Sequence, residues 1–295
     1  MKLLNKKKDI LFACHDAGSG NIILNYIQKR MTNKYNYDLL LAGPSKKICE
    51  NHHKNLKFNK VNTSEKYLYK SIITGTSFHS SFEHNIRKKF LKNKKITNIA
   101  IVDNWRNLKK RFYRKQEYVF PDLIWTIDSR SLALSKKYFP NIKSILVDNY
   151  YIINEVQKIK KNITKTNNTL LYLCEPIKFK NNGININEFY LLNYLLKNIN
   201  KLNLNKNYKI ILKLHPKEKI NKYKNWINKN KNFNISVDYI SNIGDLLSKS
   251  KIVVGFQTSA LNLALESGFE VYSSNPFISK KIIIDDNRLL YIRDL

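Results

Sequence analysis

Short and almost continuously apolar runs alternate with amphipathic segments along the whole chain. Runs without polar alternation predict strands buried on both faces, as in a parallel sheet. The apolar runs cover residues 10–14, 38–43, 71–75, 99–103, 123–128, 145–148, 170–174, 210–214, 252–256 and 270–274. Segments with helical periodicity follow several of them, at residues 21–31, 80–92, 129–139, 187–200 and 259–267. This alternation predicts an α/β protein built of doubly wound, Rossmann-like sheets.

One polar stretch divides these strands and helices into two series. Residues 154–168 read NEVQKIKKNITKTNN and show no strong hydrophobic period. We therefore expect an interdomain linker there, between an acceptor-side α/β domain at 1–153 and a nucleotide-donor-binding α/β domain at 169–295. With 295 residues, each half is long enough to bury a core of its own. We expect the two domains to face a central cleft.

The formal net charge of +31 raises the question of a nucleic-acid partner. The lysines are spread along the chain, as an AT-rich coding bias alone would produce, and no aromatic and glycine pattern of a single-strand binder accompanies them. Nucleic acid is therefore not the expected partner. Peripheral contact with an anionic membrane is preferred, because electrostatic attraction to such a surface needs no special motif.

Several further features indicate a cytoplasmic protein, peripheral to the inner face of the membrane. No run approaches the roughly 20 apolar residues of a membrane span. Residues 10–14 form too short an apolar run for a signal peptide and lack a cleavage site, so we expect the first strand there. Cys14, Cys49 and Cys174 have no metal-like spacing, and we expect buried free thiols.

In a doubly wound sheet, ligands bind beyond the carboxyl ends of the strands, so the residues that follow each apolar run are candidates. The first run is followed by His15 and Asp16, either of which is a candidate general base. Gly18 and Gly20 come next, and their backbone is expected to approach a phosphate of the donor. The structural alternative is a turn in which Asp16 caps the following helix.

Two more strand ends in the first half carry polar side chains. Ser80 and Glu83 fit a capping box at a helix start, which is the structural alternative to a role for Glu83 in the site. Asp103 and Trp105 follow the fourth run and are expected to line the acceptor side of the cleft. Arg111 is expected on a solvated helix face.

The second half offers candidates for binding the donor. Glu175 follows its first strand and is expected to face the cleft. His215, held by Pro216 at the end of the next strand, is expected to donate a hydrogen bond to the donor phosphate.

Thr258 and Ser259 lie at the start of a helical pattern, where hydroxyls and free N–H groups make an anion site, or a simple N-cap. We expect them and His215 to converge on one anion pocket from two neighbouring strand ends. Glu266 is a candidate contact to a sugar hydroxyl or ribose, or else a surface acid at the end of its helix.

These residues resemble the GT-B fold of nucleotide-sugar glycosyltransferases, within it the bacterial sialyltransferase and capsule-polysaccharide group. In that group an HP motif and a Ser/Thr pair hold the donor phosphate, and an acidic motif ending in glycine supplies the base. His215-Pro216 matches the first motif and Thr258-Ser259 the second. Asp16-Ala17-Gly18 matches the third in part, because the motif usually has two acids, and Glu83 is the reserve base.

The resemblance implies an enzyme that moves a sugar from a nucleotide-sugar donor to a hydroxyl of a surface-polysaccharide or lipid-linked glycan acceptor. Asp16 would take the acceptor proton. We expect no cofactor and no obligatory metal, because no Asp-x-Asp pair follows a strand as in metal-bound diphosphate sites. Two alternatives remain open: a nucleotide-sugar 2-epimerase or hydrolase of the same fold, and a non-enzymatic, basic nucleic-acid-binding protein.

Overall fold

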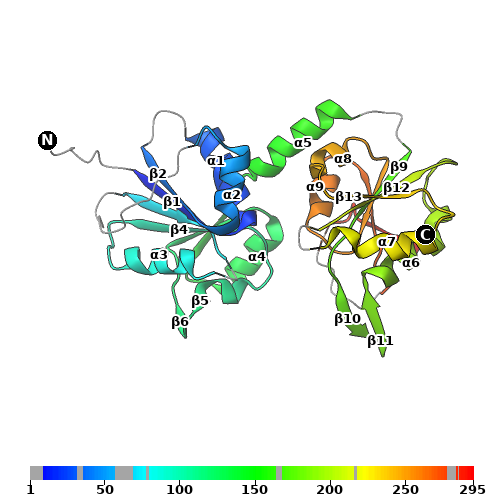
Figure 1. Ribbon diagram of the computed structural model, residues 1–295. Coiled ribbons are helices and arrows are strands. Elements are labelled where there is room, and N and C mark those ends of the chain that lie inside the picture. The colour runs from blue at the N-terminus through cyan, green and yellow to red at the C-terminus, as the bar shows by residue number, and fades with distance from the viewer. Residues whose placement is uncertain are drawn as a thin grey trace. The chain divides into compact units, whose positions relative to one another are not determined.

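The chain folds into two compact α/β domains that divide between Tyr151 and Ile152 (Figure 1). A computed structural model describes residues 9–31, 36–56, 69–77, 80–163, 168–215, 218–277, 284 and 286–295. Each domain is built on a six-stranded parallel sheet. The prediction of two Rossmann-like domains is confirmed.

The first domain has the strand order β2-β1-β3-β4-β7-β8, and every pairing in this sheet is parallel. Its strands are β1 (Ile10–Cys14), β2 (Tyr37–Leu41), β3 (Ser71–Thr74), β4 (Thr97–Val102), β7 (Leu123–Thr126) and β8 (Lys143–Leu146). Its helices are α1 (Ala17–Arg30), α2 (Gly43–His52), α3 (Phe82–Leu91), the 3-10 helix η1 (Leu108–Phe112) and α4 (Ser129–Tyr138). Each of these strands overlaps an apolar run of the sequence.

The second domain has the order β13-β12-β9-β14-β15-β16, again with parallel pairing throughout. Its strands are β9 (Thr169–Leu173), β12 (Lys209–Lys213), β13 (Ile235–Asp238), β14 (Ile252–Gly255), β15 (Glu270–Ser273) and β16 (Leu290–Tyr291). Its helices include α6 (Glu188–Asn198), η2 (Ile199–Lys201), η3 (Ile220–Tyr223), α7 (Lys224–Lys229), α8 (Ile243–Leu247), α9 (Ala260–Glu266) and η4 (Ile292–Asp294).

Two antiparallel hairpins were not predicted. One joins β5 (Tyr113–Arg114) to β6 (Glu117–Tyr118), and the other joins β10 (Lys178–Asn181) to β11 (Ile184–Asn187). The second turns at Asn182 and Gly183, which both have positive φ, as a tight hairpin turn requires. An Asn-Gly pair is a recognised hairpin signal, so the sequence did contain the sign of this element.

The predicted linker is wrong over most of its length. Residues 154–162 belong to helix α5 (Tyr150–Asn162), and 164–167 lie outside the described residues. Ile152, Val156 and Ile159 pack into the apolar cluster of the second domain. Their spacing of four and three residues is that of one helix face, a signal masked by the many polar residues between them.

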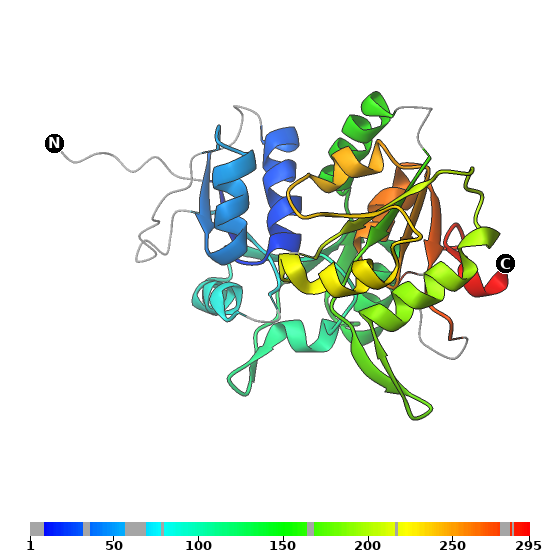
Figure 2. The same ribbon diagram turned by 45° about the vertical axis from the view of Figure 1, so that its right-hand side comes forward.

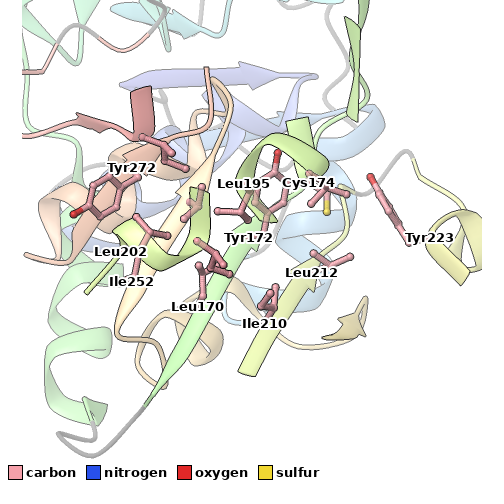
Figure 3. Packing of buried hydrophobic residues seen from close by; sticks show 14 of the residues in the cluster. Leu170, Tyr172, Cys174, Leu195, Leu202, Ile210, Leu212, Tyr223, Ile252 and Tyr272 are labelled. Carbon is pink, nitrogen blue, oxygen red and sulfur yellow. The ribbon is translucent and has the colours of Figure 1, made fainter. Parts of the chain in front are cut away.

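Apolar side chains fill both faces of each sheet. In the second domain, Leu170, Tyr172, Leu212 and Ile252 pack with residues of α6 in one cluster (Figure 3). Cys14, Cys49 and Cys174 are buried and free, as expected. Among the described residues, none of the helices combines the length and the apolar character needed to cross a bilayer.

Helix α1 begins at Ala17, four residues before the predicted start, and therefore contains both glycines of the first loop. Gly20 is buried against α2: a Cβ at this position would lie 2.7 Å from the Cβ of Ser45 and 3.2 Å from its Cα. The glycine thus permits close packing of two helices.

Gly20→Ala should lower the free energy of unfolding by roughly 1–2 kcal/mol, because overpacking outweighs the better helix propensity of alanine. Urea denaturation measures this value. In a Ser45→Gly background, which removes the clashing Cβ, most of the cost should disappear. An equal cost in both backgrounds would contradict this packing explanation.

Candidate functional site

A histidine and a carboxylate pair directly after β1. His15 Nδ1 and Asp16 Oδ1 lie 2.7 Å apart, and both side chains are about a quarter to a third exposed. Asp16 occupies the N-cap position of α1, but its side chain makes no capping hydrogen bond. The capping alternative therefore does not describe this carboxylate, which instead orients the imidazole at the carboxyl edge of the sheet.

Gly43, at the start of α2, fixes the other side of the imidazole. Its φ is +51°, and a Cβ there would lie 2.5 Å from His15 Nε2. Only glycine permits both this backbone conformation and this close approach. We did not predict Gly43 as a site residue, although its position at the end of an apolar run was a usable signal.

Glu83 lies beneath this pair, almost completely buried at 1% exposure. Its Oε1 accepts a hydrogen bond of 2.8 Å from the backbone N–H of His15. Oε2 has no hydrogen-bond partner among the described residues. Burial raises the pKa of the Glu83 carboxyl above its usual value, and the His15 N–H opposes that shift only in part.

The predicted capping box is therefore wrong. The N-cap residue of α3 is Ser81, and Ser80 Oγ accepts a hydrogen bond from the backbone N–H of Phe82. The carboxylate of Glu83 points instead to the β1 loop, a partner 68 residues away along the chain. A local sequence pattern could not reveal this contact.

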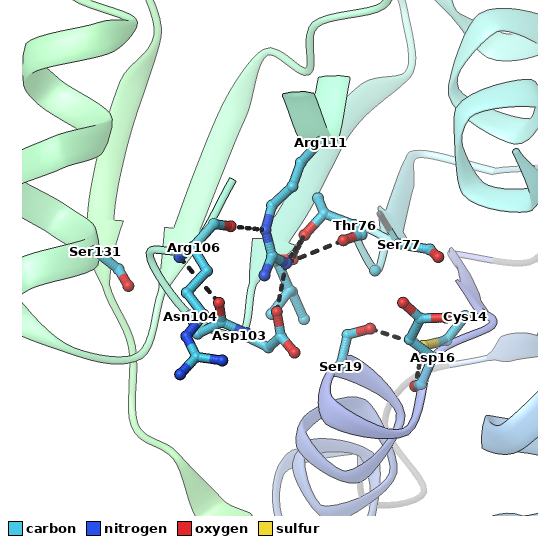
Figure 4. A network of polar contacts seen from close by, with 12 residues as sticks. Cys14, Asp16, Ser19, Thr76, Ser77, Asp103, Asn104, Arg106, Arg111 and Ser131 are labelled. Atoms are coloured by element: carbon cyan, nitrogen blue, oxygen red, sulfur yellow. Dashed lines mark hydrogen bonds and ion pairs between the residues drawn. The ribbon is translucent and has the colours of Figure 1, made fainter. Parts of the chain in front are cut away.

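Asp103 forms a shielded ion pair at the end of β4 (Figure 4). Its Oδ1 accepts a hydrogen bond of 2.5 Å from Arg111 Nη1, which also donates to the carbonyl and hydroxyl of Thr76. Arg111 is buried, so the prediction of a solvated helix face is wrong. The reason is that η1 turns this guanidinium inward, where the Asp103 carboxylate balances its charge and the Arg106 carbonyl accepts a hydrogen bond from it.

The two glycines of the first loop serve packing between elements of the first domain. A Cβ on Gly18 would lie 2.0 Å from Asp103 Oδ2, so the carboxylate of Asp103 stands beside the first turn of α1. Gly20 faces Ser45. Both glycines thus have a packing role within the domain, and their contact with a donor phosphate stays a prediction.

Three arginines hold the loop after β3. Its consecutive carbonyl oxygens each accept from a different guanidinium: that of Gly75 from Arg87, that of Thr76 from Arg111 and that of Ser77 from Arg114. Arg87 is buried, and burial lowers its pKa to about 10. These cations offset the negative charge of Glu83 and Asp103 and fix the backbone beside Asp16. Arg87 was not predicted as a site residue, although it lies four residues after Glu83 on one helix face.

Trp105 lies near this group but faces a different partner. The guanidinium of Arg130, from the first turn of α4, lies 3.9 Å above the centre of its ring. A cation over an indole face is a stabilising contact. The structure thus gives Trp105 a partner within its own domain, and its contact with an acceptor stays a prediction.

The second domain places its candidates along the carboxyl edge of its sheet, in the order β12, β9, β14 and β15. His215 follows β12, Glu175 follows β9, and Thr258 and Ser259 follow β14. The expectation that His215 and the hydroxyl pair follow neighbouring strands is wrong, because β9 lies between β12 and β14. Glu175 occupies the strand end between them.

A buried carboxylate fixes the backbone of His215. Glu218 Oε2 accepts a hydrogen bond of 3.1 Å from the His215 N–H, and Oε1 accepts from Lys222 Nζ and Tyr223 Oη at 2.7 Å each. The side chain of Glu218 is only 1% exposed. Pro216 lies outside the described residues. The carboxylate of Glu218 is thus an anchor for this strand end.

The strand end after β14 is tied to the one after β9. Glu175 Oε2 accepts a hydrogen bond of 3.3 Å from the backbone N–H of Gln257. Ser259 occupies the N-cap position of α9 without a side-chain capping bond, and Thr258 Oγ1 accepts weakly from the Ala260 N–H at 3.4 Å. A simple N-cap role therefore does not account for the Ser259 hydroxyl, and it accounts only weakly for that of Thr258.

Glu266 does not join this group. It is the last residue of α9, which begins at the carboxyl edge of the sheet and runs back toward the start of β15. Its carboxylate pairs with Arg288 Nη2 at 2.5 Å. Its position and this ion pair favour the alternative of a surface acid over contact with a sugar.

Comparison with known proteins identifies the fold. No protein-family model matches the sequence, and no curated protein matches it. The chain is similar in structure to the UDP-GlcNAc 2-epimerase of Neisseria meningitidis, solved bound to UDP-GlcNAc, with a TM-score of 0.65, 12% identity, and coverage of 92% of this chain and 84% of that one.

Two further solved structures match over most of their length. The UDP-GlcNAc 2-epimerase of Methanocaldococcus jannaschii has a TM-score of 0.64 and 11% identity, with 97% of this chain and 89% of that one covered. The glycotransferase of kitacinnamycin has a TM-score of 0.52 and 8% identity, with 90% and 80% covered. These likenesses support the GT-B-type fold. None of these three is a sialyltransferase, so that part of the resemblance stays an expectation.

The raised pKa of Glu83 makes stability depend on pH. The folded state binds the Glu83 proton more tightly than the unfolded state does, so protonation of this carboxyl stabilises the fold. This stabilisation is fully present below the unfolded-state pKa, near 4.5, and is lost as pH rises through the folded-state pKa. The free energy of unfolding of the wild type, minus that of Glu83→Gln, should therefore be larger at pH 5 than at pH 7.5. Urea denaturation at both values measures it, and a difference that grows with pH would contradict the assignment.

Proposed function

We propose that this chain is an enzyme that transfers a sugar from a nucleotide-sugar to a hydroxyl of a surface-polysaccharide or lipid-linked glycan acceptor, without a metal ion. The first domain supplies the acid–base groups. The second domain binds the nucleotide-linked phosphate. The structures of similar fold support the substrate class, since one was solved with UDP-GlcNAc bound.

One observation carries the proposal: the His15–Asp16 pair stands at the exit of β1, backed by Glu83. Asp16 Oδ1 is engaged by the imidazole, and its Oδ2 is placed to accept a proton from a hydroxyl. Such a base makes the acceptor oxygen a better nucleophile toward the anomeric carbon. The hydrogen bonds at His15 Nδ1 and at its backbone N–H hold the pair in place before substrate arrives.

In the second domain, His215 and the hydroxyls of Thr258 and Ser259 would stabilise the phosphate as it departs. Negative charge grows on that group while the glycosidic bond breaks, so donors placed beforehand lower the barrier. Glu175, at the strand end between them, is engaged with the Gln257 N–H. In this proposal it holds the strand end and does not contact the phosphate.

Asp16→Asn should lower transfer by about 10²–10⁴-fold, the usual range for losing a general base, while nucleotide binding stays unchanged. Transfer is followed as nucleotide release that depends on added acceptor, with EDTA present. Asp9→Asn is the matched control, because Asp9 lies just before the other end of β1 and pairs with Lys70. Wild-type rates in Asp16→Asn would remove this carboxylate from the reaction.

His215→Ala should lower kcat by roughly 10²-fold, the scale for losing one donor to developing charge. The exposed His52 at the end of α2 supplies a control of the same chemistry, and His52→Ala should retain full activity. Circular dichroism checks that both variants fold. Equal activity of the two variants would exclude His215 from the site.

A second candidate is a nucleotide-sugar 2-epimerase. Of the three solved structures described above, the two with the higher TM-scores are UDP-GlcNAc 2-epimerases. The first domain also holds a carboxyl with a raised pKa, Glu83, close to the ionisable pair of His15 and Asp16. Removing and returning a proton at a sugar carbon uses two such groups. Conversion of UDP-GlcNAc without any acceptor, seen by NMR of the sugar product, would favour this candidate over transfer.

A further inference from the structure

The hairpin of β5 and β6 exposes aromatic rings on the first domain. It projects from the body of that domain in both views (Figures 1 and 2). Tyr118 is 53% exposed, Tyr113 is 39% exposed, and Phe120, which follows β6, is 36% exposed. We call residues 113–120 the aromatic hairpin. Large rings exposed together on a short projection indicate a surface built for contact.

These rings form one continuous cluster that reaches the core of the domain. The ring centres of Tyr113 and Tyr118 lie 4.7 Å apart, and Tyr118 and Phe120 stack at 5.2 Å with an angle of 15° between their planes. Phe120 then contacts the buried rings of Phe112 and Phe139 at 6.0 and 5.6 Å. The exposed rings are thus held rigidly by the fold, so binding would cost little conformational entropy.

Positive charge surrounds the rings. Lys109, Lys110 and Lys115 are exposed, and Lys109 Nζ lies 4.6 Å from the ring centre of Tyr138 on α4. The acid within the hairpin, Glu117, is neutralised by Lys88 Nζ at 2.5 Å. The surface therefore combines apolar rings with cations and offers no unbalanced carboxylate of its own.

The tip of the aromatic hairpin has residues that are unfavourable for its turn. Lys115 and Gln116 have φ of +47° and +62°, where asparagine and glycine are usual. A long basic side chain at such a position is strained, and local backbone strain is often found at functional sites. A lysine at the outermost point of an aromatic projection would be the first group to meet an anionic surface.

We propose that the aromatic hairpin is a membrane contact, in which Tyr113, Tyr118 and Phe120 enter the headgroup region of an anionic bilayer. Lys109, Lys110 and Lys115 would bind lipid phosphates around them. Tyrosine suits this depth, because its ring is apolar and its hydroxyl stays hydrated. Single-stranded nucleic acid fits less well, because stacking with bases needs free ring faces, and Tyr118 and Phe120 already stack on each other.

Flotation of the full chain with vesicles tests this proposal, using pure phosphatidylcholine against phosphatidylcholine with 30% phosphatidylglycerol. The wild type should float with the anionic vesicles in 0.1 M salt and dissociate in 0.5 M salt. Replacing Lys109, Lys110 and Lys115 by Gln should weaken binding about 100-fold, at roughly fivefold for each basic residue near the surface. Tyr118→Ala should weaken binding several-fold, and Tyr118→Trp should restore it with a blue-shifted fluorescence on binding.

Two control variants distinguish binding through this hairpin from non-specific binding through net charge or any exposed aromatic ring. The first control replaces three exposed lysines of the second domain by Gln and gives the same change of net charge: Lys224, Lys229 and Lys231. Tyr239→Ala removes a ring that is 51% exposed elsewhere. Both controls should float like the wild type. Failure of the wild type to float, or an equal loss in hairpin and control variants, would overturn the proposal. Vesicle binding needs no sugar substrate, so either result leaves the proposed reaction standing.

Discussion

Parallel strands on both sides of a central strand are the constraint on which the rest of this structure depends. β1 lies between β2 and β3, and β9 lies between β12 and β14. This pairing satisfies the backbone of each central strand and buries its side chains on both faces. Polar side chains that can reach a ligand therefore lie where the strands end, at the carboxyl edge of each sheet. His15 and Glu175 stand at these two strand ends.

Buried charges then fix the geometry at those edges. In the first domain Glu83 engages the backbone of His15, and Asp103 pairs with Arg111 beside the first turn of α1. In the second domain Glu218 engages the backbone of His215 in the same manner. Burying a charge is costly unless it is paired or hydrogen-bonded, and Glu218 meets this cost with three donors: the His215 N–H, Lys222 and Tyr223. The resulting rigidity holds the histidines in defined positions before any ligand binds.

The sequence predicts the strands well because an apolar run is a local signal. It predicts the site less well because contacts between strand ends are not local. Nothing near His215 or Thr258 in the chain reveals that β9 separates their strands. The close neighbour of Gly18, Asp103, lies 85 positions later in the chain, so no local pattern reveals this contact. The helix at residues 154–162 was missed because three apolar residues carry its period among many polar ones.

Hydrogen–deuterium exchange of the full chain, with and without nucleotide, tests the central claim that the carboxyl edge of the second sheet binds the phosphate. CMP, UDP, GDP and dTDP are compared, and a nucleotide that raises the melting temperature is taken forward. Amides that follow β12, β9 and β14 should exchange more slowly with it, whereas those at the other end of these strands should not change. Slower exchange elsewhere alone, with no change at these three strand ends, would contradict the account.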